Sequence, residues 1–160
     1  FADLPFDGAI YHSDHVWRGT QGVLLFPEGA LVPVCAPALM QRFQGKTMPD
    51  LSHLTHLHLS SRPDAWRQWY GANTYEYGPQ AAGGPRYELF TMMLAAVQAG
   101  LGVGLMPQFL AQPKLDEGSL MMPLPHVLTV TQGYYFGYPK REEPSEALAV
   151  FETWLTSVCA

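Results

Sequence analysis

Short apolar runs alternate with longer amphipathic stretches along most of the chain. Strand-like runs occupy residues 6–11, two parts of 22–37 that are separated by Pro27, Glu28 and Gly29, and residues 53–59, 101–107 and 133–139. Helical periods occupy residues 36–43, the stretch after residue 61 and residues 145–159. Residues 87–100 begin as a short strand that leads into a helix ending at Gly100. This alternation predicts an α/β fold with a mostly parallel sheet.

The helix after residue 61 carries local signals at both ends. Ser61 stands three residues before Asp64, as in an N-terminal cap, and Pro63 would lie in the first turn. Gly71 is expected to end this helix. Its buried face is predicted from helical spacing to comprise Trp66, Trp69 and Tyr70.

Two further segments give expectations about surface and core. Residues 71–86 read as a loop that is long for a compact domain, either an exposed excursion or a functional lid. The closing helix, residues 145–159, is amphipathic. Its apolar stripe is predicted to comprise Leu148, Phe151, Leu155 and Val158.

Composition and charge narrow the function classes. The 160 residues suffice for one domain or two small lobes, and only 14% of them are charged, against about 25% in an average domain. Nine basic and fourteen acidic residues give a net charge of −5 without a basic cluster, which disfavours direct contact with nucleic acid. No apolar run approaches the roughly 18 residues of a membrane span, and no leader opens the chain. We therefore expect a soluble protein with no membrane partner.

Cysteine and histidine patterns do not favour redox or metal chemistry. Cys35 and Cys159 lie in apolar segments, where a small buried side chain is expected and a reducing compartment is consistent. His53, His56 and His58 fall close together, but a metal site needs three or four ligands. We expect no metal and no cofactor. The sequence also lacks the nucleophile-elbow, P-loop and zinc-protease motifs, which argues against an enzyme.

Polar and aromatic side chains gather where the expected strands end. Ligands of open α/β sheets bind beyond the carboxyl ends of strands, near helix N-termini. Positions of this kind are His12, Ser13, Asp14, Ser60, Ser61, Arg62, Leu89, Phe90, Thr91, Tyr134 and Tyr135. They suit a small carboxylate or zwitterion, with Arg62 or the helix N-terminus binding the acid group and Asp14 an amino group. Alternatively, Asp14 caps a turn, Arg62 pairs with Asp64 and the tyrosines only pack.

Six stretches occur in a characteristic order. They read DGAIYHSDHVWRGT, LLFPEGALVPVCAPAL, DLSHLTHLHLSSRPDAWRQWY, RYELFTMMLAAVQAGLGVGLMPQFL, EGSLMMPL and GYYFGYP. This ordered series resembles the effector-binding domain of LysR-type transcriptional regulators, and most closely the subgroup with the glycine-cleavage activator and the β-lactamase regulators. The resemblance covers nearly the whole chain.

The resemblance implies a periplasmic-binding-protein-like fold of type II. In this fold two Rossmann-like lobes are joined by two crossover strands, and the effector binds in the cleft between the lobes. Mapped onto this chain, residues 1–33 and 130–160 form lobe I and residues 34–129 form lobe II. The family's opening strand, helix and strand have no counterpart before Phe1. We therefore expect an incomplete lobe I, whose uncovered strand edge favours non-native association.

The resemblance also implies a function. The chain is expected to be the effector-sensing and oligomerisation domain of a cytoplasmic bacterial transcription regulator, a homodimer or homotetramer at full length. DNA would be bound through a helix-turn-helix that is absent from this chain. The expected effector-binding residues are His12, Ser13, Asp14, Ser60, Arg62, Phe90, Thr91, Tyr134 and Tyr135. The alternative is a stand-alone solute-binding protein of the same fold, which would need an export signal or a lipoprotein cysteine.

One loop departs from the subgroup pattern. In the sequence DHVW, His15 stands where the subgroup usually has glycine, so the backbone there is less free. Trp17 closes the same stretch, and we expect it to pack rather than to contact the effector, because large aromatic side chains chiefly bury area.

Overall fold

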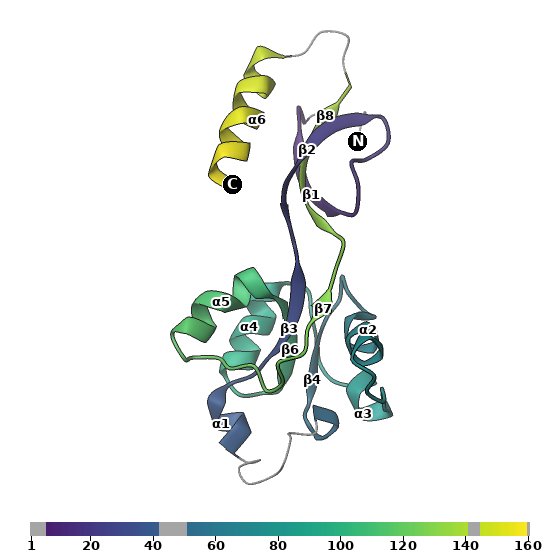
Figure 1. Cartoon of the computed structure of the whole chain (residues 1–160), viewed down its shortest axis with the longest axis vertical. Coiled ribbons are helices and arrows are strands. Elements are labelled where there is room, and N and C mark those ends of the chain that lie inside the picture. Colours follow the sequence, from purple (N-terminus) through teal and green to yellow (C-terminus); the bar gives the residue numbers. More distant parts are fainter. Residues whose placement is uncertain (1–5, 42–50, 141–144, 160) are drawn as a thin grey trace. The chain divides into compact units, whose positions relative to one another are not determined.

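The chain forms two compact units. The computed structural model describes residues 6–41, 51–140 and 145–159. Unit 1 comprises Phe1–Gly29 and Val130–Ala160, and unit 2 comprises Ala30–Thr129. The chain passes between the units twice, after Gly29 and after Thr129 (Figure 1). The resemblance assigned residues 30–33 to lobe I, but these residues belong to a strand of unit 2.

Unit 1 is an antiparallel sheet with one helix packed against it. Its strands lie in the order β1 (Ala9–Ser13), β8 (Gly133–Pro139) and β2 (Thr20–Pro27), and helix α6 (Glu146–Cys159) lies against β2 (Figure 1). Leu25, Phe136 and Leu155 form the buried core of this unit.

The predicted apolar stripe of α6 is only partly buried. Leu155 is buried and Leu148 half-buried, whereas Phe151 and Val158 are 42% and 59% exposed. Helical spacing identifies an apolar face, but it does not show whether anything covers that face. Of the predicted stripe, Phe151 and Val158 thus remain largely exposed.

Unit 2 is built on a mixed five-stranded sheet. The strand order is β5 (Arg86–Tyr87), β4 (His56–Leu59), β6 (Val103–Pro107), β3 (Ala30–Val34) and β7 (Leu128–Thr129). Strand β4 runs parallel to β5 and β6, whereas β3 runs antiparallel to β6 and β7. The prediction of a mostly parallel sheet is therefore wrong, because an alternation of elements along the chain does not fix which strands become neighbours.

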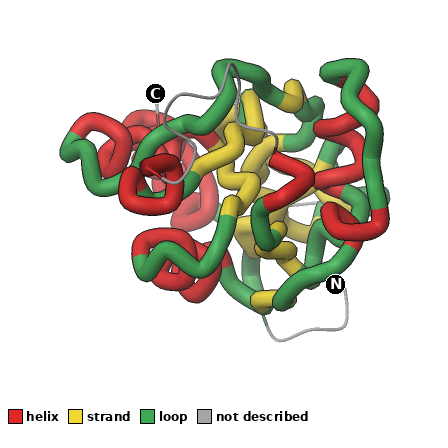
Figure 2. The backbone as a smooth tube through the Cα atoms, turned by 90° about the horizontal axis from the view of Figure 1, so that it is seen from below, coloured by secondary structure: helices red, strands yellow, loops and turns green. Residues whose placement is uncertain are grey.

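Helices cover both faces of this sheet, which buries β4 and β6 completely. Helices α4 (Phe90–Gln98) and α5 (Gln108–Asp116) lie on one face, and α2 (Ala65–Ala72) and α3 (Pro79–Ala82) lie on the other (Figures 1 and 2). The remaining short elements are α1 (Pro37–Met40) and the 3-10 turn η2 (Leu51–His53). Residues 42 and 43 of the predicted helix over 36–43 lie outside the described residues.

Helix α2 begins later than its sequence signals predict. It starts at Ala65, and Ser61 lies in a turn that the hydrogen bond from Arg62 N to Leu59 O closes at 2.9 Å. Pro63 disfavours the helical region for the residue before it, which explains why the helix cannot extend back over Arg62. The buried face is confirmed, since Trp66, Trp69 and Tyr70 are all at most 3% exposed.

Two boundaries in the following segment also differ from expectation. Helix α2 continues through Gly71 to Ala72. The stretch 71–86, predicted as loop, contains α3, whose first residue is Pro79. Proline is well suited to that position, because a first-turn residue needs no helical N–H hydrogen bond.

Candidate functional site

The carboxyl ends of β4 and β5 bring two polar side chains together. The strands run parallel with Leu59 opposite Tyr87, so the residues that follow them are neighbours. Ser60 N donates to Tyr87 O at 2.8 Å, and Ser60 Oγ donates to Glu88 Oε1 at 2.9 Å. Glu88 is absent from the sequence-based candidates, although its place directly after a strand could have identified it.

A cation lies over an aromatic ring beside this strand end. The guanidinium carbon of Arg62 is 5.4 Å from the ring centroid of Phe90, the first residue of α4. Thr91 follows in the first turn of α4 and is exposed. Ser60, Arg62, Glu88 and Phe90 are called the Arg62 cluster below. The cluster contains a cation, a carboxylate, a hydroxyl and the N-terminus of a nine-residue helix.

The surface pairing expected as an alternative for Arg62 is not the one observed. Asp64 Oδ1 lies 2.8 Å from Arg67 Nη2, one helical turn further on. Because Arg62 precedes α2 by three residues, it does not stand at that helix's N-terminus as predicted. The helix N-terminus that it approaches is that of α4.

His12 forms a second polar pair, within unit 1. Its Nε2 lies 3.1 Å from Glu28 Oε2, and the Glu28 side chain is fully buried. His12 is paired in the sheet with Tyr134, and their rings are 5.1 Å apart. Tyr134 in turn stacks on Phe26 at 4.9 Å. No sequence pattern singled out Glu28, which stands in the break between two apolar runs.

Asp14 is held by its own neighbours. His15 Nδ1 and Ser13 Oγ both hydrogen-bond to Asp14 Oδ1. The hydrogen bond from His15 holds the pKa of the exposed Asp14 carboxyl below its usual range, with further support from the backbone N–H and from the charge of His15. Tyr135 donates from its hydroxyl to Asp14 O at 3.4 Å.

The structure thus divides the unit 1 candidates into two groups. Tyr134 and Tyr135 are consecutive in β8, so their side chains point to opposite faces of the sheet. His12 and Tyr134 share one face, whereas Tyr135 lies 5.9 Å from the Tyr11 ring on the other. Trp17 stacks on Tyr11 at 4.0 Å and remains 39% exposed, so its predicted role in packing rather than effector contact stays a prediction.

The clustered histidines serve the packing of unit 2. His56 donates from Nδ1 to Leu54 O at 2.9 Å and accepts from the Tyr70 hydroxyl at Nε2 at 3.0 Å, while His58 Nε2 donates to Gly83 O at 2.8 Å. Burial lowers the pKa of His56 to about 4, although the hydrogen bond to Leu54 favours the charged ring. Within the described ranges no group of three or more His, Cys, Asp and Glu residues could hold a metal ion.

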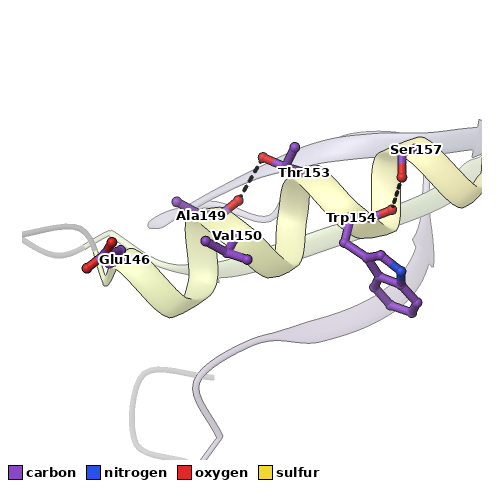
Figure 3. A pocket seen from close by; sticks show the side chains of 6 residues that line it. All are labelled: Glu146, Ala149, Val150, Thr153, Trp154 and Ser157. Carbon is purple, nitrogen blue, oxygen red and sulfur yellow. Dashed lines mark hydrogen bonds between the residues drawn. The ribbon is translucent and has the colours of Figure 1, made fainter.

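An apolar groove runs along α6 (Figure 3). Its volume is about 480 Å³, and Val150 and Trp154 line it at 65% and 55% exposure. The hydroxyls of Thr153 and Ser157 donate to carbonyls of the same helix, Ala149 O and Trp154 O (Figure 3). Both hydroxyl protons are therefore engaged within the helix. In the part of the chain that is described, no helix is both long and apolar enough to cross a membrane.

Comparison with known proteins identifies the family. The model of the LysR substrate binding domain matches residues 4–160. The chain is 28% identical over 161 residues to the HTH-type transcriptional regulator y4mQ of Sinorhizobium fredii, covering 99% of this chain and 53% of the relative. It is 30% identical to the glycine cleavage system transcriptional activator of Escherichia coli, covering 96% and 50%. The chain thus spans about half the length of these relatives.

Solved structures agree on the fold. The effector domain of the transcriptional regulator AmpR of Pseudomonas aeruginosa superposes with a TM-score of 0.79 at 24% identity, over 96% of this chain and 71% of that one. Full-length LysG of Corynebacterium glutamicum, described with bound effector Arg, gives a TM-score of 0.69 at 18% identity, over 96% and 51%. These likenesses show the mixed α/β, periplasmic-binding-protein-like fold of type II. The chain belongs to the LysR substrate binding domain family of transcriptional regulators.

Proposed function

We propose that this chain is the effector-sensing domain of a cytoplasmic LysR-type regulator and that it binds a small carboxylate or amino acid. The observation that supports this proposal is the Arg62 cluster. A guanidinium, a hydroxyl and a helix N-terminus converge where two parallel strands end, which is where α/β sheets bind ligands. The guanidinium and the N–H groups of the helix N-terminus can donate hydrogen bonds to an acid group, while the Ser60 hydroxyl donates to Glu88 beside them.

The residues of unit 1 complete the proposed effector-binding set. We propose contributions from His12, Ser13, Asp14, Tyr134 and Tyr135, together with Thr91 of unit 2. Because His12 and Tyr134 lie on one face of the sheet and Tyr135 on the other, a small effector would contact only one of these two groups. Phenol and imidazole groups can both donate and accept hydrogen bonds, so they would bind polar substituents of the ligand.

The role proposed for the whole protein is regulatory rather than enzymatic. The curated relatives described above are transcriptional regulators and are about twice as long as this chain. We propose that the full-length protein is a homodimer or homotetramer that binds DNA through a helix-turn-helix outside this chain. Effector binding would shift the population of conformations of this domain and thereby alter transcription.

Ligand screening tests the proposal. The twenty L-amino acids and a set of small carboxylates are added to the chain, and the melting temperature is followed. A ligand that binds the folded chain raises this temperature. Arg62→Ala should weaken binding of the hit about tenfold or more, because a charge-assisted bond is lost. Arg67→Ala removes the same charge five residues away and should bind like the parent.

The site assignment fails if Arg62→Ala binds the hit as tightly as Arg67→Ala does. The regulatory role has its own test, which is the genomic sequence upstream of Phe1. A helix-turn-helix there supports the regulator, whereas a signal peptide would favour the solute-binding alternative.

A further inference from the structure

Glu88 places a negative charge beside the site proposed for the acid group, and a site that binds only carboxylates does not need such a charge. Its side chain is exposed and carries a negative charge, and it stands two residues before the N-terminus of α4, where the proposed acid group would bind. A second carboxylate at such a place repels a simple acid by like charge. The position of Glu88 therefore needs an explanation beyond the binding of acids.

The contacts of the Arg62 cluster link the loop after β4 to the loop between β5 and α4 at two places. Ser60 is bonded to Glu88 at 2.9 Å, Glu88 precedes Phe90 by two residues, Arg62 lies over Phe90, and Arg62 follows Ser60 by two residues. The carboxylate of Glu88 and the guanidinium of Arg62 are thus held close together by contacts between these two neighbouring loops. Both charges belong to unit 2 alone, so this pairing does not depend on how the two units are arranged.

Glu88 retains the capacity to bind an ammonium group. A carboxylate offers about four acceptor positions. The hydrogen bond from Ser60 occupies Oε1 and fixes the orientation of the group. Asp14, the residue first expected to bind an amino group, is already engaged by His15 and Ser13.

We propose that Glu88 is a specificity-determining residue, which selects an effector that carries an ammonium group next to its acid group. The effector is thereby an amino acid, with its carboxylate at Arg62 and its ammonium at Glu88. A carboxylic acid without the amino group meets the uncompensated charge of Glu88 and binds less tightly. This inference rests on the proposed function and adds the class of its ligand.

Matched ligand pairs test the proposal by calorimetric titration of the chain. Each pair consists of an L-amino acid and the acid that lacks its α-amino group, for example L-phenylalanine with 3-phenylpropionate and L-glutamate with glutarate. The best-binding amino acid should bind about tenfold more tightly than its des-amino partner, the size of one charge-assisted hydrogen bond. In Glu88→Gln, which keeps an oxygen for Ser60, this ratio should fall to within about twofold.

The control is Glu76→Gln, which removes a charge from another exposed glutamate of unit 2 and should keep the parent's ratio. The inference is overturned if Glu88→Gln, with an unchanged circular dichroism spectrum, keeps the parent's preference. It is also overturned if the parent binds both members of each pair equally, in which case acid binding, and with it the proposed function, still stands. If no amino acid or acid binds, both fall together.

Discussion

His56 is a neutral ring whose two nitrogens have different partners. Its Nδ1 donates to Leu54 O and its Nε2 accepts from Tyr70, and the side chain is inaccessible to solvent. This arrangement requires the uncharged tautomer, because the charged ring has a proton on both nitrogens and cannot accept. A charge at this place would also be cut off from water.

The stability of unit 2 should therefore decrease in acid. Burial lowers the pKa of His56 from 6.5 to about 4, so as the pH falls the unfolded chain takes up this proton before the folded chain does. The free energy of unfolding should drop between about pH 6.5 and pH 4 by on the order of 3 kcal/mol, and this contribution should level off below pH 4. Urea unfolding of the parent and of His56→Gln at several pH values measures it. An equal loss in the non-titrating variant would contradict the assignment.

Cys35 should be chemically inert. The residue is inaccessible to solvent, and burial raises the pKa of its thiol to about 12, so at pH 8 only roughly one molecule in ten thousand carries the reactive thiolate. Cys159 is half-buried at the end of α6 and should react first. Iodoacetamide labelling of the folded chain, followed by peptide mass spectrometry, distinguishes the two sites. Equal labelling rates would show that Cys35 is accessible.

For individual residues, the sequence predicted which side chains are candidates for the site better than it predicted their hydrogen-bond and ion-pair partners. The pattern of strand ends located Ser60, Arg62 and Phe90, and these residues are close together in the structure. It did not locate Glu28, which becomes notable only through His12, a side chain distant in sequence, and it left out Glu88 although that residue directly follows a strand. The predicted partner of Asp64 was also wrong, because Arg67 lies one helical turn from Asp64 whereas Arg62 is two residues away, a spacing that does not face on a helix.

At the scale of elements, Trp66 joins α2 to the sheet. It is 1% exposed and donates from Nε1 to Leu57 O in β4 at 3.0 Å. The bond falls within a cluster of rings that includes His56 at 4.4 Å and Trp69 at 5.7 Å. The side chain therefore satisfies a buried carbonyl besides filling volume.

Trp66→Phe should destabilise the chain by about 2 kcal/mol, because Leu57 O loses its side-chain donor and a cavity remains. The matched control is Trp154→Phe, the same change at a side chain that is 55% exposed, which should stay within about 0.5 kcal/mol of the parent. Urea unfolding followed by far-UV circular dichroism measures both. Comparable losses at the two positions would contradict the structural role given to Trp66.

Element boundaries followed from sequence where one local signal dominates. Residues 133–139 were predicted as a strand and form β8 with those bounds, since an aromatic-rich run ends at a proline. The start of α2 was missed, because the signals of Ser61 and Pro63 compete and the restriction from proline prevails. Strand direction was also missed, because β3 and β6 lie about 70 residues apart and pair antiparallel through tertiary contacts.

At the scale of the whole molecule, the exposed apolar face of α6 has a consequence for association. Val150, Phe151, Trp154 and Val158 are all exposed along this helix, and β1 is an edge strand of the same unit. Contiguous apolar surface of this kind promotes self-association. Strand edges do so as well.

The chain should therefore associate as its concentration rises, and Trp154→Lys should reduce this association. A lysine places a charge in the middle of the apolar face at a position where the parent side chain is 55% exposed, so folding should be little affected. Sedimentation velocity over a range of concentrations compares the two proteins. A parent that stays monomeric throughout would contradict the prediction. Equal association of both proteins would indicate that the chain associates through the edge of β1 and not through α6.

The central claim, that the Arg62 cluster binds an effector, is tested most directly by a crystal structure of the chain with a ligand found by screening. We expect density for the ligand with its acid group hydrogen-bonded to the guanidinium of Arg62, beside the first turn of α4. A ligand bound only elsewhere, such as in the groove along α6, with no contact to Arg62, would contradict the claim.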